Sequence, residues 1–225
     1  MELSENVIQV LKNFATINSS IVIEPGNNLS TISEARNVLG SAVIDQEFPR
    51  GFGLYDLNEF LNVVGLVDSP RLRFEDTHVL VGDSTGRSTI KYFYTDTEML
   101  TKPPATFNMP EPEIVIDLSN DVLNKVKRAA SVLGHGEMVI TSGNGCITLT
   151  IQDSENATSN TFSIDVPAKF DYERMFNFVL NIQNLKVLPG DYEVKISSKL
   201  ISQFTSKDGT VEYHIALEKT STYGE

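Results

Sequence analysis

Residues 4–16, Ser-Glu-Asn-Val-Ile-Gln-Val-Leu-Lys-Asn-Phe-Ala-Thr, and residues 119–131, Ser-Asn-Asp-Val-Leu-Asn-Lys-Val-Lys-Arg-Ala-Ala-Ser, have the same pattern. In both, apolar residues recur at helical spacing behind a serine, which is a favoured N-cap residue. A shift of 115 (119 − 4) pairs Ser4 with Ser119 and Val7 with Val122. The sequence therefore predicts two similar halves, each with a helix near its start.

A second helix is predicted in each half. After Tyr55, the residues Leu57, Phe60 and Val64 form one apolar side of a helix that ends by Pro70. The same shift pairs Asp56 with Asp171, which predicts a matching helix from Asp171 to about Leu185.

Short runs rich in β-forming residues lie between and after these helices. Turn residues such as glycine, proline and asparagine separate the runs, as in consecutive antiparallel strands. Expected strands are 21–23, 29–32, 42–44, 71–74, 78–81, 88–94, 138–141, 147–152 and 161–165, with three more closing the chain. The fold class is therefore α+β.

A proline-rich stretch separates the two halves. It contains Pro103, Pro104, Pro110 and Pro112, a composition typical of a connector. We expect one domain over residues 1–109 and a second over residues 110–225.

The composition is that of a globular protein with 225 residues, of which 40% are hydrophobic. The formal net charge is −12, so any contact with nucleic acid must use a locally basic face. Cys146 is the single cysteine and cannot form an internal disulfide. Neither a bilayer-spanning run nor a secretory leader is recognised, so we expect a soluble, intracellular protein.

The sequence gives little support to catalysis or metal binding. His78, His135 and His214 lie more than fifty residues apart, outside any metal-binding spacing. The glycines of 51–53 and 82–86 lack the glycine-lysine-serine or -threonine ending of a phosphate loop. We expect no cofactor, no metal and no enzymatic activity.

Five segments resemble the sliding clamps of T-even-type tailed bacteriophages. They are 11–19 (Leu-Lys-Asn-Phe-Ala-Thr-Ile-Asn-Ser), 55–61 (Tyr-Asp-Leu-Asn-Glu-Phe-Leu), 176–181 (Phe-Asn-Phe-Val-Leu-Asn), 188–192 (Leu-Pro-Gly-Asp-Tyr) and 215–218 (Ile-Ala-Leu-Glu). The matches are spread over nearly the whole chain in the right order.

The resemblance implies a homotrimeric ring of two-domain subunits, with two helices of each domain facing a central hole and antiparallel sheets outside. It implies that an ATP-dependent clamp loader opens the ring onto double-stranded DNA and that the replicative polymerase then binds it. Clamps of this family also assist late viral transcription. The expected location is the cytoplasm of the infected bacterial host.

A sliding ring needs few DNA contacts that are insensitive to sequence, because strong neutralisation of phosphates would hinder movement. The predicted helix from Ser119 carries Lys125, Lys127 and Arg128 on its polar side. Lys12 lies on the polar side of the first helix, and Arg174 on that of the fourth. With the resemblance we expect these five to face DNA; without it, they are ordinary solvated helix charges.

Partners of such clamps usually insert a short apolar peptide beside the interdomain connector. Candidate partner-binding residues are Phe107 and Met109 in the connector and Tyr213 in the last strand. Anchoring of the connector onto one domain explains Phe107 and Met109 equally well.

Two other functions remain open from the sequence. A duplicated β-rich viral structural or scaffold protein without DNA tethering would also have an acidic surface. A small hydrolase could use scattered carboxylates such as Asp83 and Glu137, although no spacing recommends it.

Overall fold

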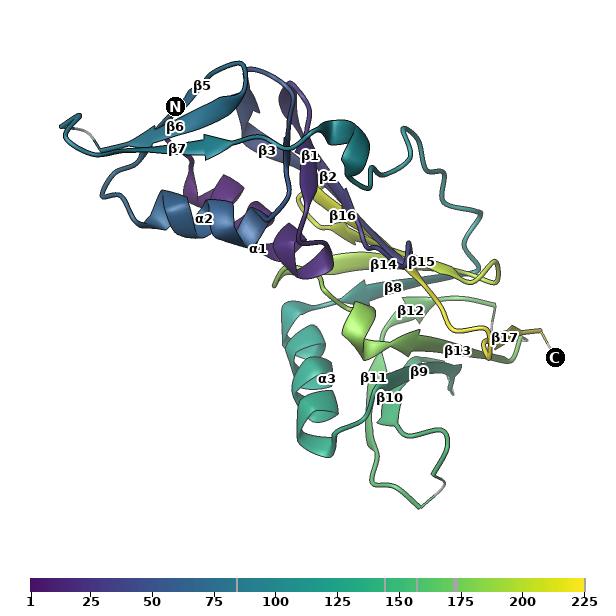
Figure 1. Cartoon of the computed structure of the whole chain (residues 1–225). Helices are drawn as coiled ribbons and strands as arrows, with labels where there is room; N and C mark the ends of the chain where they lie inside the picture. The colour runs from purple at the N-terminus through teal and green to yellow at the C-terminus, as the bar shows by residue number, and fades with distance from the viewer. Residues whose placement is uncertain (84, 144, 157, 172–173, 225) are drawn as a thin grey trace. The chain divides into compact units, whose positions relative to one another are not determined.

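A computed structural model describes all residues except 84, 144, 157, 172–173 and 225. The chain divides into two compact units, Met1–Ala105 and Thr106–Glu225, and each is described by itself. Figure 1 labels the helices and strands. No described helix is long and apolar enough to cross a membrane.

Unit 1 alternates helices with short strands. Its elements are α1 (Glu5–Ile17), β1 (Ile21–Ile23), β2 (Gly26–Ile32), β3 (Val38–Phe48), β4 (Phe52–Leu54), α2 (Leu57–Gly65), β5 (Arg71–Phe74), β6 (His78–Gly82), β7 (Thr89–Phe93) and a 3-10 turn (Thr97–Met99). Antiparallel pairs join β1 to β4, β2 to β3, β5 to β6 and β6 to β7. The helices α1 and α2 contact each other.

Unit 1 contains a cluster of packed aromatic rings. The ring of Phe48 meets those of Phe52 and Phe74 edge-on, with both pairs of centroids 5.9 Å apart. Tyr94 stacks on Phe52 at 4.8 Å. Such contacts stabilise a core beyond the burial of apolar area.

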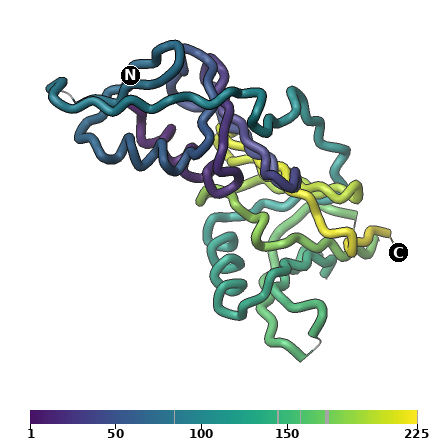
Figure 2. The backbone as a smooth tube through the Cα atoms, in the orientation of Figure 1, coloured from purple at the N-terminus to yellow at the C-terminus, as the bar shows by residue number. Residues whose placement is uncertain are grey.

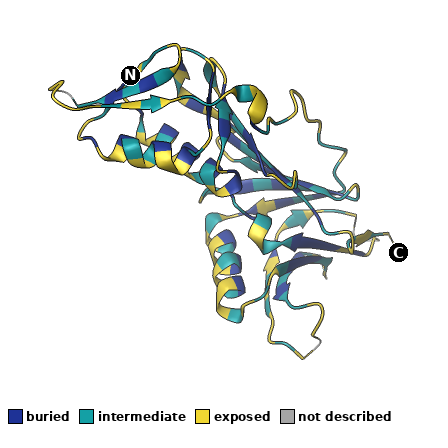
Figure 3. Ribbon diagram, in the orientation of Figure 1, coloured by how far each residue is buried: buried dark blue, intermediate teal, exposed yellow. Residues whose placement is uncertain are grey.

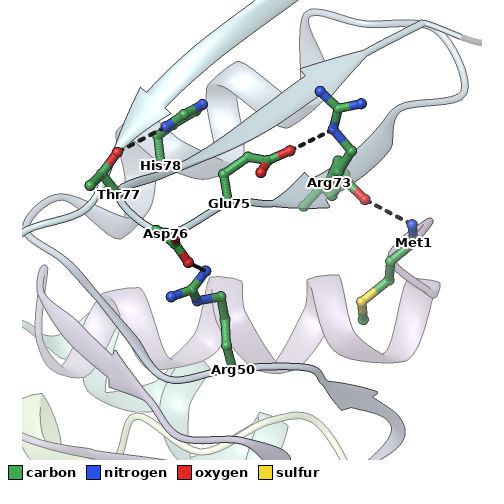
Figure 4. A network of polar contacts seen from close by, with 8 residues as sticks. Met1, Arg50, Arg73, Glu75, Asp76, Thr77 and His78 are labelled. Atoms are coloured by element: carbon green, nitrogen blue, oxygen red, sulfur yellow. Dashed lines mark hydrogen bonds and ion pairs between the residues drawn. The ribbon is translucent and has the colours of Figure 1, made fainter.

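A polar network covers the turn between β5 and β6 (Figure 4). The amino group of Met1 donates to the carbonyl of Leu72 at 2.8 Å, and the Leu72 amide donates back to Met1 at 2.7 Å. Arg73 pairs with Glu75, and Arg50 pairs with Asp76. The two backbone bonds attach the residues before α1 to β5, whereas exposed ion pairs contribute little to stability.

Unit 2 begins with a strand and a helix. Its elements are β8 (Ile114–Leu118), α3 (Asn120–Leu133), β9 (Glu137–Ser142), β10 (Ile147–Gln152), β11 (Phe162–Val166), β12 (Ala168–Lys169), β13 (Phe176–Asn181), a 3-10 turn (Ile182–Asn184), β14 (Tyr192–Ser197), β15 (Ile201–Ser206), β16 (Val211–Ala216) and β17 (Thr222–Tyr223). One sheet has the order β11-β10-β9-β13-β17, and β12-β8-β14-β15-β16 form the other.

The two sheets of unit 2 pack face to face. A core cavity of about 10 Å³ is lined by Leu149 and Leu180 of the first sheet and by Ile116 and Phe204 of the second. Figure 3 shows buried residues along the strands and exposed ones along the outer side of α3. The alternating burial of β10 is that of a strand with one face in a core.

The predicted α+β class and the first helix of each half are confirmed. Ser4 and Ser119 both cap their helices, because each hydroxyl accepts from the amide three residues later, at Val7 and Val122. Residues 100–113 run without helix or strand (Figure 2), as the prolines predict.

The predicted helix from Asp171 to about Leu185 is wrong. Its apolar core, Phe176–Asn181, is the strand β13, which pairs with β9. Short apolar runs fit either period, and the aromatic and β-branched residues Phe176, Phe178 and Val179 favour a strand here. Unit 2 therefore has one α-helix among its described residues, instead of the two expected.

Candidate functional site

Each unit has its own candidate site, the polar face of its first helix: α1 in unit 1 and α3 in unit 2. Lys12 is exposed on α1, on the side away from the buried Leu11 and Phe14. On α3, Lys125 and Arg128 are exposed on the side away from the buried Leu123 and Ala130. Both helices thus present cations to solvent from an otherwise acidic chain.

The segment Leu188–Tyr192 holds the start of α3. The amide of Asn120 donates to the carboxylate of Asp191 at 2.7 Å, and the Gly190 amide donates to the side-chain oxygen of Asn120 at 3.0 Å. The Tyr192 hydroxyl donates to the Leu188 carbonyl at 2.7 Å. A carboxylate at a helix N-terminus is favourable, so this segment fixes the polar face of α3.

Lys127 does not lie on the exposed face with its two neighbours. It follows Leu123 by four residues, about 40° around the helix, and so borders the buried side. Its ammonium donates to the carbonyl of Val187 at 3.1 Å, and burial lowers its pKa. The prediction that Lys127 lies on the polar side with Lys125 and Arg128 is wrong, because the buried residues of α3 are Leu123, Val126 and Ala130 and Lys127 lies next to them on the helix.

Lys125 and Arg128 differ in how much charge they offer. The ammonium of Lys125 pairs with the carboxylate of Asp121, one turn earlier, at 2.7 Å. Arg128 has no ion pair within the described part of the chain.

Lys125 and Arg128 both line a groove beside α3. Its floor is apolar and is formed by Ala129, Val132, Leu133 and Phe162.

Arg174 lies in the loop before β13, because the helix expected there does not form. Its amide donates to the carbonyl of Asp171 at 3.1 Å, and its guanidinium lies 3.8 Å from the Asp171 carboxylate. The side chain is exposed. A DNA contact by Arg174 would therefore come from a turn rather than from a helix face.

The three candidate partner-binding residues fall in different environments. Phe107 is 43% exposed, and its ring lies 4.4 Å from that of His214, centroid to centroid. Met109 is half-buried. Tyr213 is fully buried, and its hydroxyl accepts from the Leu188 amide at 3.3 Å, so it supports the core beneath the surface.

His214 is a buried polar residue next to Phe107. Neither ring nitrogen has a hydrogen-bond partner, and Nε2 lies 3.6 Å from the Glu212 carboxylate. Burial lowers the pKa of His214, against the opposing effect of Glu212. The folded protein therefore favours the neutral imidazole.

The carboxylates named for a hydrolase have structural roles. Asp83 accepts from the hydroxyls of Ser88 and Thr85, which holds its pKa far below the usual range. Glu137 accepts from the Ser154 amide at 3.3 Å. Within the described residues, no group of three or more histidine, cysteine or acidic side chains could hold a metal ion.

The apolar floor of the groove beside α3 was not predicted from the sequence. Val132 is 76% exposed, although it lies in the last turn of a helix with an otherwise polar outer face. An isolated valine at a polar helix position was the available signal. Phe162 has no such signal, because an aromatic residue at the start of a strand does not indicate which helix the strand packs beside.

The arrangement of each unit, with an amphipathic helix packed beside antiparallel sheets, is that of a DNA clamp. The structure of Proliferating Cellular Nuclear Antigen from Entamoeba histolytica matches the structure of this chain with a TM-score of 0.69, over 95% of both chains. The sequences are 13% identical, so this likeness shows the fold.

Sequence comparisons give the family. Residues 4–96 match the model described as DNA polymerase processivity factor, and residues 115–219 match the gp45 sliding clamp, C terminal. The sliding clamp of Vibrio phage KVP40 is 33% identical over 97% of this chain and 99% of its own. Those of Escherichia phage RB69 and Enterobacteria phage T4 are 30% and 29% identical over 99% of both chains.

The chain therefore belongs to the sliding clamp family of DNA polymerase processivity factors. This confirms the resemblance to clamps of T-even-type phages and supports DNA tethering. The alternative of a viral scaffold protein has no support from these matches.

Proposed function

We propose that three copies of this chain close into a ring that encircles duplex DNA and tethers the replicative polymerase without catalysing a reaction. An ATP-dependent clamp loader opens the ring, and the cytoplasm of the infected host is its place of action. Each unit, Met1–Ala105 and Thr106–Glu225, serves as one clamp domain, with the boundary in the connector.

The observation that carries this proposal is the pair of serine-capped helices α1 and α3. Each presents exposed cations, Lys12 on α1 and both Lys125 and Arg128 on α3, although the chain has a net charge of −12. Membership of the clamp family supports placing these faces toward DNA. A protein that must slide benefits from a few such contacts, because each phosphate that is neutralised adds salt-dependent affinity.

The proposed DNA-facing set is Lys12, Lys125, Arg128 and Arg174. Lys127 is left out because its ammonium is occupied by the Val187 carbonyl. The ion pair with Asp121 leaves Lys125 as a weaker phosphate partner than Arg128.

Partner binding is proposed at the connector. Phe107 offers an exposed aromatic edge beside the half-buried Met109, a surface suited to an apolar peptide. Tyr213 is buried, so its proposed part is to support the core of unit 2 rather than to contact the peptide. The replicative polymerase and the clamp loader are the proposed partners.

The test is polymerase product length on primed circular DNA with loader, at physiological salt. A chain with Lys12→Glu, Lys125→Glu and Arg128→Glu should give short products and leave DNA quickly. The matched control carries the same charge change at the exposed Lys169, Lys199 and Lys219 and should behave as the wild type. Products that the wild-type chain does not lengthen would refute the proposed function, whatever the variants do.

A further inference from the structure

His214 of β16 is a buried residue whose polar atoms are unsatisfied. It is 4% exposed, and neither ring nitrogen has a hydrogen-bond partner among the described residues. The Glu212 carboxylate lies 3.6 Å from Nε2, which is too far for a good hydrogen bond. Buried imidazoles normally have partners, so the two nitrogens of His214 require an explanation.

The side chain of His214 lies on the face of its sheet that points away from the core of unit 2. The neighbouring Tyr213 points into that core, where its ring lies 6.3 Å from that of Tyr192, and successive side chains of a strand alternate between faces. Gln203 of β15 is directly opposite His214 and is half-buried on the same face. Together with Glu212 these residues form a polar floor.

The ring of Phe107 covers this floor. Its centroid lies 4.4 Å from that of His214, while Phe107 itself is 43% exposed. An aromatic ring keeps solvent from the imidazole but offers at most a weak hydrogen-bonding partner in return. Phe107 therefore shields His214 without satisfying its nitrogens.

The connector segment that carries this ring is held weakly. Residues 106–110 make no hydrogen bond within the described part of the chain. The connector is fixed from Glu111 onward, because the Ser197 hydroxyl donates to the Glu111 carbonyl at 3.1 Å and the Ser198 amide donates to the Glu113 carboxylate at 2.8 Å. The segment can therefore move about a fixed point at residue 111 without breaking a hydrogen bond.

We propose that Phe107 is an internal occupant of the partner site, which a peptide of the partner displaces when it binds to His214. The peptide combines an aromatic or branched apolar side chain, which replaces the Phe107 ring, with a neighbouring hydroxyl or amide that hydrogen-bonds to the imidazole. An acidic group is unsuited, because Glu212 and the net charge of −12 repel it. This inference rests on the proposed partner binding at the connector and names the chemistry of the partner.

The first test is the direction in which Phe107→Ala changes affinity for the replicative polymerase of the same phage. Binding should strengthen about tenfold, since a site that is open about a tenth of the time binds about tenfold more weakly than an open one. Titration without DNA measures it. The matched control is Tyr55→Ala, an aromatic residue of unit 1 that is 72% exposed, which should bind as the wild type does. Unchanged or weaker binding by Phe107→Ala would overturn the inference.

His214→Leu separates a binding role from a structural one. The variant should melt at or above the temperature of the wild type, because leucine removes a buried polar group that has no partner. Its affinity for the polymerase should fall about fivefold, which is typical of one lost hydrogen bond. Normal affinity in the folded His214→Leu chain would refute the proposed hydrogen bond.

A measurement without any partner tests the cover itself. Diethyl pyrocarbonate acylates accessible imidazoles, and peptide mapping follows His78, His135 and His214 separately. In Phe107→Ala, His214 should react about tenfold faster than in the wild type, whereas His78 serves as the internal control and should react equally in both. Equal rates for His214 would show that Phe107 is not its cover.

The outcomes separate this inference from the proposed function. A wild-type chain that binds neither the polymerase nor the clamp loader would refute the proposed partners, and this inference with them. A wild-type chain that binds the polymerase, with the same affinity in Phe107→Ala and in His214→Leu, would leave the proposed function intact and overturn the displaceable cover alone.

Discussion

The hydroxyl of Tyr92 on β7 donates to the carboxylate of Glu59 on α2 at 3.0 Å. The same hydroxyl lies 3.1 Å from the carbonyl of Asp56, the N-cap residue of α2. Burial, together with Glu59, raises the pKa of Tyr92, so the phenol stays protonated and can donate. This relationship fixes the edge strand of unit 1 against its helix and holds Ile90 on the same face.

Tyr92→Phe should destabilise unit 1 by about 1 kcal/mol, the usual contribution of one hydrogen bond. The expected fall in melting temperature is about 2–4 °C for a chain of this size. Thermal unfolding followed by circular dichroism measures it. Tyr55→Phe, at a 72% exposed position, is the control and should melt with the wild type; equal melting of Tyr92→Phe would contradict a stabilising role.

Gly53 in β4 leaves no room for a side chain. A Cβ there would lie 2.6 Å from the carbonyl oxygen of Thr95 and 2.9 Å from Leu100 Cδ1. Gly53→Ala must displace backbone and should cost about 1–3 kcal/mol, as overpacking does. Gly65→Ala, at the end of α2 with nothing within 4 Å, should instead stabilise the protein. Denaturant unfolding distinguishes the two, and a neutral Gly53→Ala would contradict the close approach.

The helices α1 and α3 could be predicted because local signals agree there. Ser4 and Ser119 supply the caps, and the apolar residues that follow keep helical spacing over three turns. For β13 the same reasoning failed, since residues 176–181 are buried by pairing with β9, which lies far away in the sequence. The aligned Asp56 and Asp171 looked equivalent, yet only Asp56 caps a helix.

Helix periodicity predicts which side chains of the candidate site are exposed only where they lie far from the buried side of the helix. Lys12 and Arg128 lie well away from the buried arcs of their helices, so small errors in that arc leave them exposed. Lys127 lies at the border between the buried and exposed sides of α3. Its environment depends on the loop of residues 185–190, which supplies the Val187 carbonyl that accepts from its ammonium. The groove depends on Phe162 of β11 and Val132 of α3 lining the same space, an arrangement that the sequence pattern of neither segment indicates.

Ser119→Ala should destabilise unit 2 by about 1 kcal/mol, because the amide of Val122 loses its side-chain acceptor. Ser119→Asp is the matched control, since aspartate caps helices as well as serine does and its charge suits the N-terminus. Denaturant unfolding measures both variants. Equal losses for alanine and aspartate would show that the hydroxyl acts in some way other than capping.

Lys127→Met should lower stability and leave DNA retention unchanged. It keeps the apolar stem but leaves the Val187 carbonyl without its donor, at a cost of about 1 kcal/mol. Arg128→Met is the matched comparison and should do the opposite, with normal melting and weaker, less salt-dependent retention on DNA. Loss of DNA retention in Lys127→Met would return Lys127 to the DNA-facing set.

His214 should make the stability of unit 2 sensitive to mild acid. Its pKa in the folded chain lies below the ordinary value of 6.5, because burial disfavours the imidazolium. As the pH falls, the unfolded chain therefore binds the proton first, which favours unfolding. The contribution of His214 is fully present above pH 6.5 and is lost as the pH falls from there through the folded-state pKa.

The measurement compares melting temperatures at pH 7.5 and pH 5.5 in the wild type and in His214→Gln. The glutamine variant lacks the titrating group, so its melting temperature should fall less over that interval, even if it starts lower because a buried amide also lacks partners. Glu212→Gln should widen the fall, since the carboxylate 3.6 Å from Nε2 opposes the lowering of the His214 pKa. An identical fall in the wild type and His214→Gln would mean that the proton is taken up elsewhere, and that Phe107 and its neighbours do not keep the imidazole neutral.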